Sequence, residues 1–386
     1  MRILKLIWKN MLRHKLRSVL TILGIAIAVM AFVLLRTVVT AWYAGVEASA
    51  NNRLVVRNSV SFIFPVPYSY GERIARVPGV VKISYANWFQ GVYIDESNFF
   101  SRMAVDAETF FENYPEFIID PAQLATFKQE RNACVIGTKI AEKYKLKIGD
   151  LMQLRGDIYP GMWEFVVRGI YRPRDKRTDA MQMLFHWKYI DERMKQEMPG
   201  RAGDVGWYIV TIHDPSQAAR ISDDIDALFA NSRAETKTET EAAFQQSFVS
   251  MSGAIITAMN VISFVIIGII MLVLGNTMVM TARERIREYA VLKTLGFTKW
   301  HIIGLIAGES LLISAVGGLF GLLIAFPLIQ GFAAAIPQGL FPVFEVEPIT
   351  IALSGLSALV VGILAAVFPI WRATSMRIVD GLRQIG

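Results

Sequence analysis

AIITAMNVISFVIIGIIMLVLGNTMV, residues 254–279, contains no charged side chain. A hydrocarbon core about 30 Å thick is crossed by ~20 apolar residues in a helix that rises 1.5 Å per residue. Three further stretches, within residues 19–41, 302–330 and 349–370, are as long and as apolar, so with residues 254–280 they predict four membrane-spanning helices.

The composition divides the chain in two. Apolar residues make up 53% of it and the mean hydropathy is +0.39, yet 19% is charged. Residues 42–253 hold 25 Lys/Arg and 27 Asp/Glu, which leaves 15 and 6 of the totals of 40 and 33 for the rest of the chain. The sequence therefore predicts a folded aqueous domain between the first two spans. Because the net charge of +7 comes from the membrane flanks, it gives no support to nucleic-acid binding.

The Lys/Arg bias of the flanks predicts the orientation. An amphipathic N-terminal helix (1–18), the segment 281–300 and the tail 371–386 are basic, whereas the loop 331–348 has two glutamates and no Lys/Arg. We expect a protein of the cytoplasmic (inner) membrane whose three basic segments are cytoplasmic. The domain 42–253 and the loop are expected to lie outside, on the periplasmic side.

The outer domain has the pattern of a mixed α/β fold. Alternating apolar residues predict strands at 53–60, 80–89, 134–136, 164–171 and 207–213, among others, and residues 215–230 predict an amphipathic helix. We expect two lobes: a membrane-proximal βαβ-type lobe from 42–93 and 206–250, and an inserted distal lobe, 94–205. Residues 234–250 are expected to form a polar helix that runs into the second span. The single cysteine, Cys134, is expected to be a buried strand residue.

Motifs of catalysis and metal binding are missing from the sequence. It has no GxxxxGK[ST], GxSxG, HExxH or CxxC segment, and its four histidines are scattered. We therefore expect a non-catalytic protein that binds no cofactor or metal directly.

The segment between the second and third spans stands out. A short helix at 283–295 would carry alternating charge, would place Glu284, Arg287 and Glu288 on one exposed face, and would stop at Gly296. A basic flank accounts for the arginines alone, but not for this pattern. The third span follows with the GxxxG pair Gly304 and Gly308, a candidate for dimer or intrachain packing, and with Glu309, which needs a partner inside a membrane.

Three segments carry a family resemblance. Residues 276–310, NTMVMTARERIREYAVLKTLGFTKWHIIGLIAGES, resemble the signature of the FtsX/MacB-like permeases of ATP-binding cassette (ABC) transporters. WKNMLRHKLRSVLTILGI (8–25) resembles the entry into the family's first span, and FPIWRA (368–373) with DGLR (380–383) resembles its exit. The proline that the family has near the middle of that exit is replaced here by Val379 or a neighbour.

The resemblance implies a four-span permease with its large domain after the first span, and implies how it works. A dimer of such permeases, from two identical or two different chains, docks cytoplasmic ABC ATPase subunits that bind ATP and Mg²⁺. The motion then crosses the membrane without a central pore (mechanotransmission). We expect the ATPase to be a separate polypeptide. The coupling residues that the resemblance implies are Arg283, Glu284, Arg285, Arg287, Glu288, Lys293 and Gly296.

The resemblance leaves three roles open. The chain is either part of an exporter or extractor with a periplasmic adaptor and an outer-membrane channel, an FtsX-like relay that activates a cell-wall hydrolase, or a lipoprotein-releasing permease. The size of the outer domain, about 200 residues, favours the first role over the hydrolase-activating relay.

The topology predicts which cysteines a membrane-impermeant maleimide can reach. In intact cells a cysteine placed at Ser216 is expected to react from outside, while one at Thr298 is expected to react only after the membrane is made permeable. The opposite pattern would show that the orientation is inverted.

Overall fold

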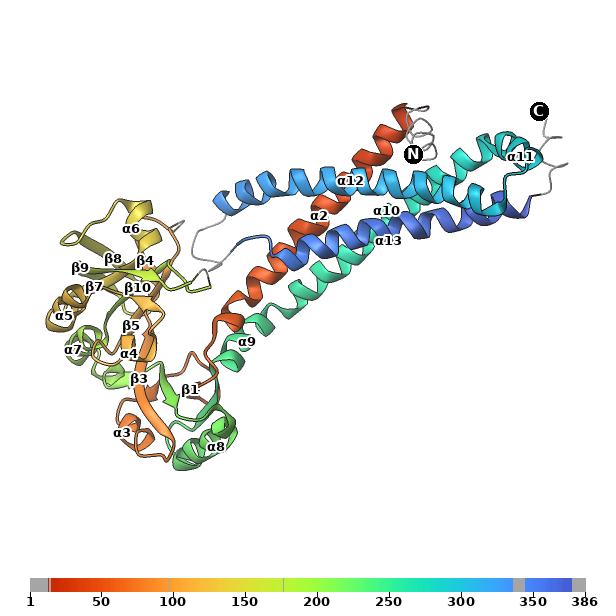
Figure 1. The fold of residues 1–386 in the computed structure, drawn as a ribbon. Coiled ribbons are helices and arrows are strands. Elements are labelled where there is room, and N and C mark those ends of the chain that lie inside the picture. Colours follow the sequence, from red (N-terminus) through yellow and green to blue (C-terminus); the bar gives the residue numbers. More distant parts are fainter. Residues whose placement is uncertain (1–12, 14, 97, 176, 336–343, 377–386) are drawn as a thin grey trace. The chain divides into compact units, whose positions relative to one another are not determined.

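The computed structural model describes residues 13, 15–96, 98–175, 177–335 and 344–376 (Figure 1). The chain divides into two compact units. The helical unit comprises the described parts of Met1–Thr40, Gly253–Ala333 and Phe344–Gly386, and the α/β unit comprises those of Ala41–Ser252 and Ala334–Val343.

The helical unit consists of long apolar helices and one short one. Its helices are α2 (Lys15–Ala48, which continues into the α/β unit), α10 (Gly253–Glu284), α11 (Ile286–Thr294), α12 (Lys299–Ala335) and α13 (Pro348–Ser375). Among the described residues α2, α10, α12 and α13 are long and apolar enough to cross a membrane, which confirms the four expected spans. Most of the expected helix at 1–18, part of the loop 331–348 and most of the tail 371–386 lie outside the described residues.

Close approach of the spans depends on glycines of α12. A methyl group at Gly317 would lie 2.7 Å from Cβ of Ile25 in α2, and one at Gly321 would lie 2.5 Å from the Ala26 carbonyl oxygen. Such distances leave no space for a side chain, so these glycines let α12 pack directly on α2. A methyl group at Gly304, by contrast, would meet no atom within 4 Å.

The α/β unit is built around one large sheet. Its strands are β1 (Arg53–Asn58), β3 (Val80–Trp88), β4 (Gly91–Val92), β5 (Ser101–Val105), β6 (Phe117–Ile118), β7 (Ala133–Gly137), β8 (Leu151–Gly156), β9 (Gly161–Pro173), β10 (Gln182–His186), β12 (Trp207–Ile212) and β13 (Thr236–Thr240), while β2 (Val66–Pro67) and β11 (Asp204–Val205) form a separate pair. The main order is β13-β1-β12-β3-β5-β10-β7-β9-β8-β4, with β6 paired to β9. The β5–β10 and β7–β9 pairs are parallel and the others are antiparallel.

Helices cover both faces of the sheet. They are α3 (Tyr70–Ile74), α4 (Phe110–Asn113), α5 (Pro121–Gln129), α6 (Thr138–Tyr144), α7 (Trp187–Glu197), α8 (Ala218–Phe229) and α9 (Glu241–Met251), with short 3₁₀ turns at Pro199–Arg201 and Pro215–Gln217. Successive residues of β10 belong to different hydrophobic clusters. Phe185 lies in the cluster that includes residues of α3, α6, α7 and α8, and Leu184 lies in the cluster that includes residues of α4 and α5. Burial on both faces explains why the central strands are almost wholly apolar.

Cys134 is fully buried in β7, as the sequence predicts. Burial raises the pKa of its thiol, which makes the reactive thiolate scarce.

The expected helix at 234–250 was wrong in its first part. Residues 236–240 form β13, which pairs with β1 at the edge of the sheet. Threonines alternate along this strand, and the Asp226 carboxylate accepts hydrogen bonds from the hydroxyls of Thr236 and Thr238. An edge strand made of threonines and charged residues is as polar as the exposed side of a surface helix. The sequence composition therefore predicted a helix where the structure has a strand. The helix α9 does follow, but Ser252 separates it from α10, so the two do not form one continuous helix.

Both expected lobes contribute to the same sheet. Strands from 42–93 and 206–250 meet those from 94–205 where β3 pairs with β5, through Ala86 and Val105 among others. In the described structure, strands from both expected lobes are therefore hydrogen-bonded into one sheet. The division into two lobes stays a prediction.

The core of this unit generates a stability prediction. We expect residues 45–248, produced alone, to be soluble and to unfold cooperatively. Within this fragment Phe185→Ala removes a fully buried ring that packs 4.4 Å from Phe165, centroid to centroid. The free energy of unfolding is expected to fall by ~3–5 kcal/mol, measured by denaturant titration. Phe64→Ala, at a ring that is 54% exposed, is the control and should have a much smaller effect. If the fragment does not unfold cooperatively, the outer domain does not fold independently of the membrane helices.

Candidate functional site

The short helix between the second and third spans, α11, is the candidate site. The sequence predicted one helix over 283–295, but the structure divides this segment: α10 continues to Glu284, and α11 begins at Ile286. The predicted stop is confirmed. Gly296 has a φ of +87°, its N–H donates to the Lys293 carbonyl, and the Phe297 N–H donates to the Leu292 carbonyl. These two bonds form a Schellman motif, which needs a residue with positive φ.

A buried ion pair joins the start of α11 to the third span. Nη1 of Arg285 lies 3.0 Å from Oε2 of Glu309 in α12, and the two side chains are 9% and 7% exposed. This contact identifies the partner that Glu309 requires inside the membrane, which the sequence alone could not choose. Arg285 also donates to Glu288, 3.0 Å away.

Two further ion pairs join this region to the first span. Arg17 of α2 holds Glu284 through two hydrogen bonds of 2.7 and 2.8 Å, and Arg13, just before α2, pairs with Glu288. Partial burial by itself would raise the pKa of Glu288, but its hydrogen bonds from Arg285 and Arg13 lower the pKa below its ordinary value. This carboxylate therefore favours folding at neutral pH, and its contribution is lost only as the pH falls through the lowered pKa.

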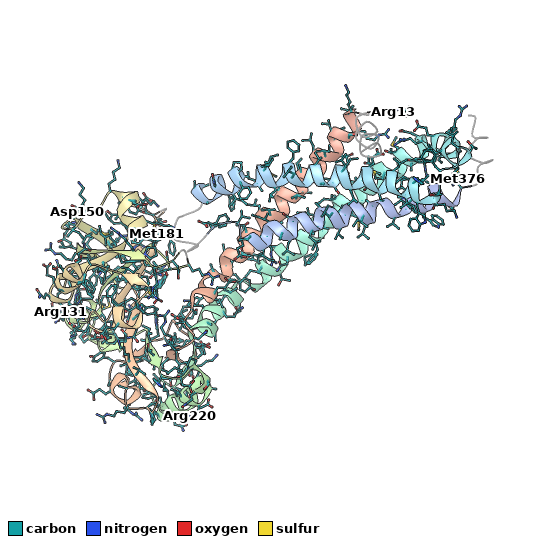
Figure 2. All side chains as sticks on the ribbon, viewed as in Figure 1. Arg13, Arg131, Asp150, Met181, Arg220 and Met376 are labelled. Atoms are coloured by element: carbon teal, nitrogen blue, oxygen red, sulfur yellow. The ribbon has the colours of Figure 1, made fainter. Side chains whose placement is uncertain are left out.

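Lys293 joins the other end of α11 to the fourth span. Its Nζ donates to the carbonyl oxygens of Ala373, Thr374 and Met376, at 3.0, 3.2 and 2.9 Å, where α13 ends. A cation there satisfies carbonyls that have no partner within the helix and complements the helix dipole. Arg13 and Met376, which mark these two anchors, lie at the same end of the helical unit as α11 (Figure 2).

The seven predicted coupling residues thus have different surroundings. Glu284, Arg285, Glu288 and Lys293 are held by side chains or carbonyls of the same chain. Glu284 is nevertheless exposed and Glu288 half-buried, so the role of both glutamates in coupling stays a prediction. Arg283, Arg287 and Gly296 are exposed. The sequence analysis missed an exposed apolar group on and after α11: Val291 (43%), Leu295 (70%), Phe297 (43%) and Trp300 (78%).

A second charged cluster, also missed, lies in the α/β unit. The guanidinium of Arg53 in β1 contacts Glu116 at 2.6 Å and Glu241 at 2.8 Å, and stacks on Tyr114. Burial alone would lower the pKa of Arg53, but the two carboxylates raise it. Because Glu241 is the first residue of α9 and also accepts from the Ala50 N–H, this cluster ties together the segments that follow α2 and precede α10.

Residues 13–376, apart from the gaps given above, contain no group of three or more His, Cys, Asp or Glu side chains placed to hold a metal ion.

The buried pair generates a prediction about stability. Arg285→Ala removes the guanidinium that pairs with the buried Glu309 carboxylate, and is expected to lower the free energy of unfolding by ~3–5 kcal/mol. Thermal unfolding of the full chain in detergent measures this, with Arg283→Ala, an exposed arginine two residues away, as the control. Arg285→Met combined with Glu309→Leu removes both charges and should recover most of the loss. If Arg285→Ala and the control unfold at the same temperature, the ion pair does not stabilise the fold.

Two family descriptions match the chain. Residues 18–228, more than half of it, match the MacB-like periplasmic core domain, and residues 260–378 match the FtsX-like permease C-terminal family.

Curated relatives carry matching names. An uncharacterized ABC transporter permease of Methanocaldococcus jannaschii is 23% identical over 84% of this chain and 82% of its own length. An uncharacterized ABC transporter permease protein of Mycobacterium tuberculosis is 27% identical over 68% of this chain, and the macrolide export ATP-binding/permease protein MacB of Nitrobacter winogradskyi is 28% identical over 47%. The matches span only 30% and 28% of the length of these last two relatives.

Solved structures of outer domains are also similar. The periplasmic region of MacB from Actinobacillus actinomycetemcomitans covers 53% of this chain and 95% of its own, with a TM-score of 0.37 and 8% identity. The extracellular domain of the transporter YknZ covers 49% of this chain and all of its own, with a TM-score of 0.36 and 11% identity. The matched residues include both the outer domain and the spans that follow it, so this membrane-embedded chain, with its extracellular α/β domain, belongs to the FtsX/MacB-like permeases of ABC transporters.

Proposed function

We propose that this chain is a permease subunit that transmits the ATP-driven motion of a cytoplasmic ABC ATPase to its outer domain, and so exports or extracts a substrate on the outer side of the membrane. The observation that carries the proposal is the dual character of α11. One side is bound to the other segments of the helical unit, and the other side exposes Arg287, Val291 and Leu295.

The exposed side has the chemistry of a docking surface. Arg287, Val291 and Leu295 follow one another at intervals of four residues, which places them on one face of the helix. A basic residue beside exposed aliphatic groups offers a partner both charge and apolar area. Arginine is also enriched in protein–protein interfaces relative to the rest of the protein surface. We name Arg287, Val291 and Leu295 the docking face, and assign ATP and Mg²⁺ to the ATPase that it would bind.

The bound side supplies the route for motion. Ion pairs of Glu284 and Glu288 join the region to the first span, the Arg285–Glu309 pair joins it to α12, and Lys293 joins it to α13. A displacement of α11 would therefore move several spans together. Through the chain, α2 and α10 lead to the two ends of the outer domain, and this continuity would carry the motion outward.

Further partners follow from the family and belong to the same proposal. We propose a dimer of permease chains in the cytoplasmic (inner) membrane, with Gly304 and Gly308 on the face of α12 available for close packing. A methyl group at Gly304 would meet no other part of the described chain within 4 Å, which leaves this position open to a second chain. Of the possible outer partners we favour a periplasmic adaptor and an outer-membrane channel. A lipoprotein carrier or a cell-wall hydrolase recovered with the purified complex would instead indicate one of the two other roles.

The docking face can be tested without disturbing the anchors. Arg287→Glu combined with Leu295→Asp reverses one charge and places another in the apolar part, which is expected to cost several kcal/mol of docking, because mismatched interface charges repel. Recovery of the ATPase with the purified permease, and ATP turnover of the reconstituted complex, should both fall at least tenfold.

Two controls make this outcome specific. Arg220→Glu, on α8 of the outer domain (Figure 2), is the same charge reversal away from α11 and should leave both readouts unchanged. Thermal unfolding of the double variant should match the parent, since both side chains are exposed. Glu284→Lys combined with Glu288→Lys is less suitable as a test, because it would also break the ion pairs with Arg17 and Arg13 within the chain.

Normal ATPase binding and turnover in the Arg287/Leu295 variant would refute the docking face.

A further inference from the structure

The loop between β1 and β2 is apolar and exposed. Residues 58–71, NSVSFIFPVPYSYG, contain no charged side chain. Within this loop Val60 is 78% exposed, Ile63 75% and Phe64 54%. Surface loops of soluble domains are usually polar, so a run of exposed apolar side chains requires an explanation.

Three backbone N–H groups of this loop find their acceptors within the loop. The Val60 N–H donates to Oδ1 of Asn58, at 3.0 Å, and the Ile63 N–H donates to Oγ of Ser61, at 3.3 Å. The Phe64 N–H donates to the Ser61 carbonyl, at 3.2 Å. These amides therefore do not depend on water, and an ordered turn of this kind can enter a poorly hydrated environment at little cost.

A ring contact joins the loop to α9. The rings of Phe62 and Phe248 lie 4.7 Å apart, centroid to centroid, and Phe248 in turn contacts Phe244. Phe248 is 36% exposed, and Met251, at the end of α9, is 72% exposed. We define the apolar surface as Val60, Ile63, Phe64, Phe248 and Met251.

Chain connectivity places this surface near the membrane. Phe248 stands five residues before Gly253, the first residue of the membrane-spanning α10. Since a chain covers at most ~3.6 Å per residue, Phe248 lies within ~18 Å of the start of that span. Residues 242–282 contain no charged side chain, so the uncharged character of α10 extends back along the whole of α9 after Glu241.

We propose that the apolar surface binds the outer leaflet of the membrane. Its continuity with α10 favours lipid as the occupant, because the same uncharged chain that crosses the hydrocarbon core also carries Phe248 and Met251. The composition agrees: aromatic and aliphatic side chains, with serines and no acids or bases, suit the boundary between headgroups and acyl chains. The contact gives the outer domain a non-covalent attachment to the bilayer in addition to its covalent connections through α2 and α10.

Depth-dependent fluorescence quenching tests the proposal on the full chain in liposomes. Ile63→Cys, and separately Phe64→Cys, is labelled with bimane and mixed with phospholipids that carry a nitroxide near the top of the acyl chain. The control is Ile148→Cys, also an exposed isoleucine in a loop of the same domain. The unmodified chain gives the labelling background, which should be low because Cys134 is fully buried.

We expect nitroxide lipids to quench the label at position 63 or 64 severalfold more than the label at 148, and aqueous iodide to show the reverse order. Equal quenching at 63, 64 and 148 by the lipids would overturn the proposal. Weak lipid quenching together with disulfide-linked dimers of Ile63→Cys would also overturn it, and would assign the surface to a second copy of the chain.

Discussion

The pairing of Arg285 with Glu309 is the interaction on which the end of the helical unit that carries α11 depends. A carboxylate in an apolar span is strongly disfavoured unless a cation meets it, and here the cation comes from the residue that joins α10 to α11. Because neither charge can be left alone, the pair fixes where α11 begins relative to α12. The remaining anchors, from Arg13, Arg17 and Lys293, are more exposed and refine a geometry that the buried pair has already set.

Packing of the spans complements this electrostatic constraint. Gly317 and Gly321 remove side chains where α12 meets α2, so the backbones approach until van der Waals contact is made. Apolar side chains gain little from meeting one another in lipid, and close backbone contact is therefore an important source of stability between spans. The helices are thus held together by charged contacts around α11 and by close packing at small residues along α12.

The sequence predicted features that depend on local patterns. The four spans, the Gly296 stop, the apolar strands and the buried Cys134 all follow from the periodicity or conformation of neighbouring residues. Features that depend on distant residues were not predictable. Glu309 could have met any of several arginines, and Glu284 is held by Arg17, 267 positions away. The strand β13 was taken for a helix because its stability comes from pairing with β1 and from Asp226, neither of which its own composition records.

The two helices that connect the membrane to the outer domain differ in stiffness. In α2 the hydrogen-bond ladder is unbroken from Lys15 to Ala48, so this helix resists both bending and twisting as a rod does. Between α9 and α10 the ladder is interrupted at Ser252, whose N–H turns back to the Val249 carbonyl. A strut with one such joint bends there at much lower cost. The outer domain is thus mounted on one rigid and one jointed support, an arrangement that favours rotation about the rigid one over straight displacement.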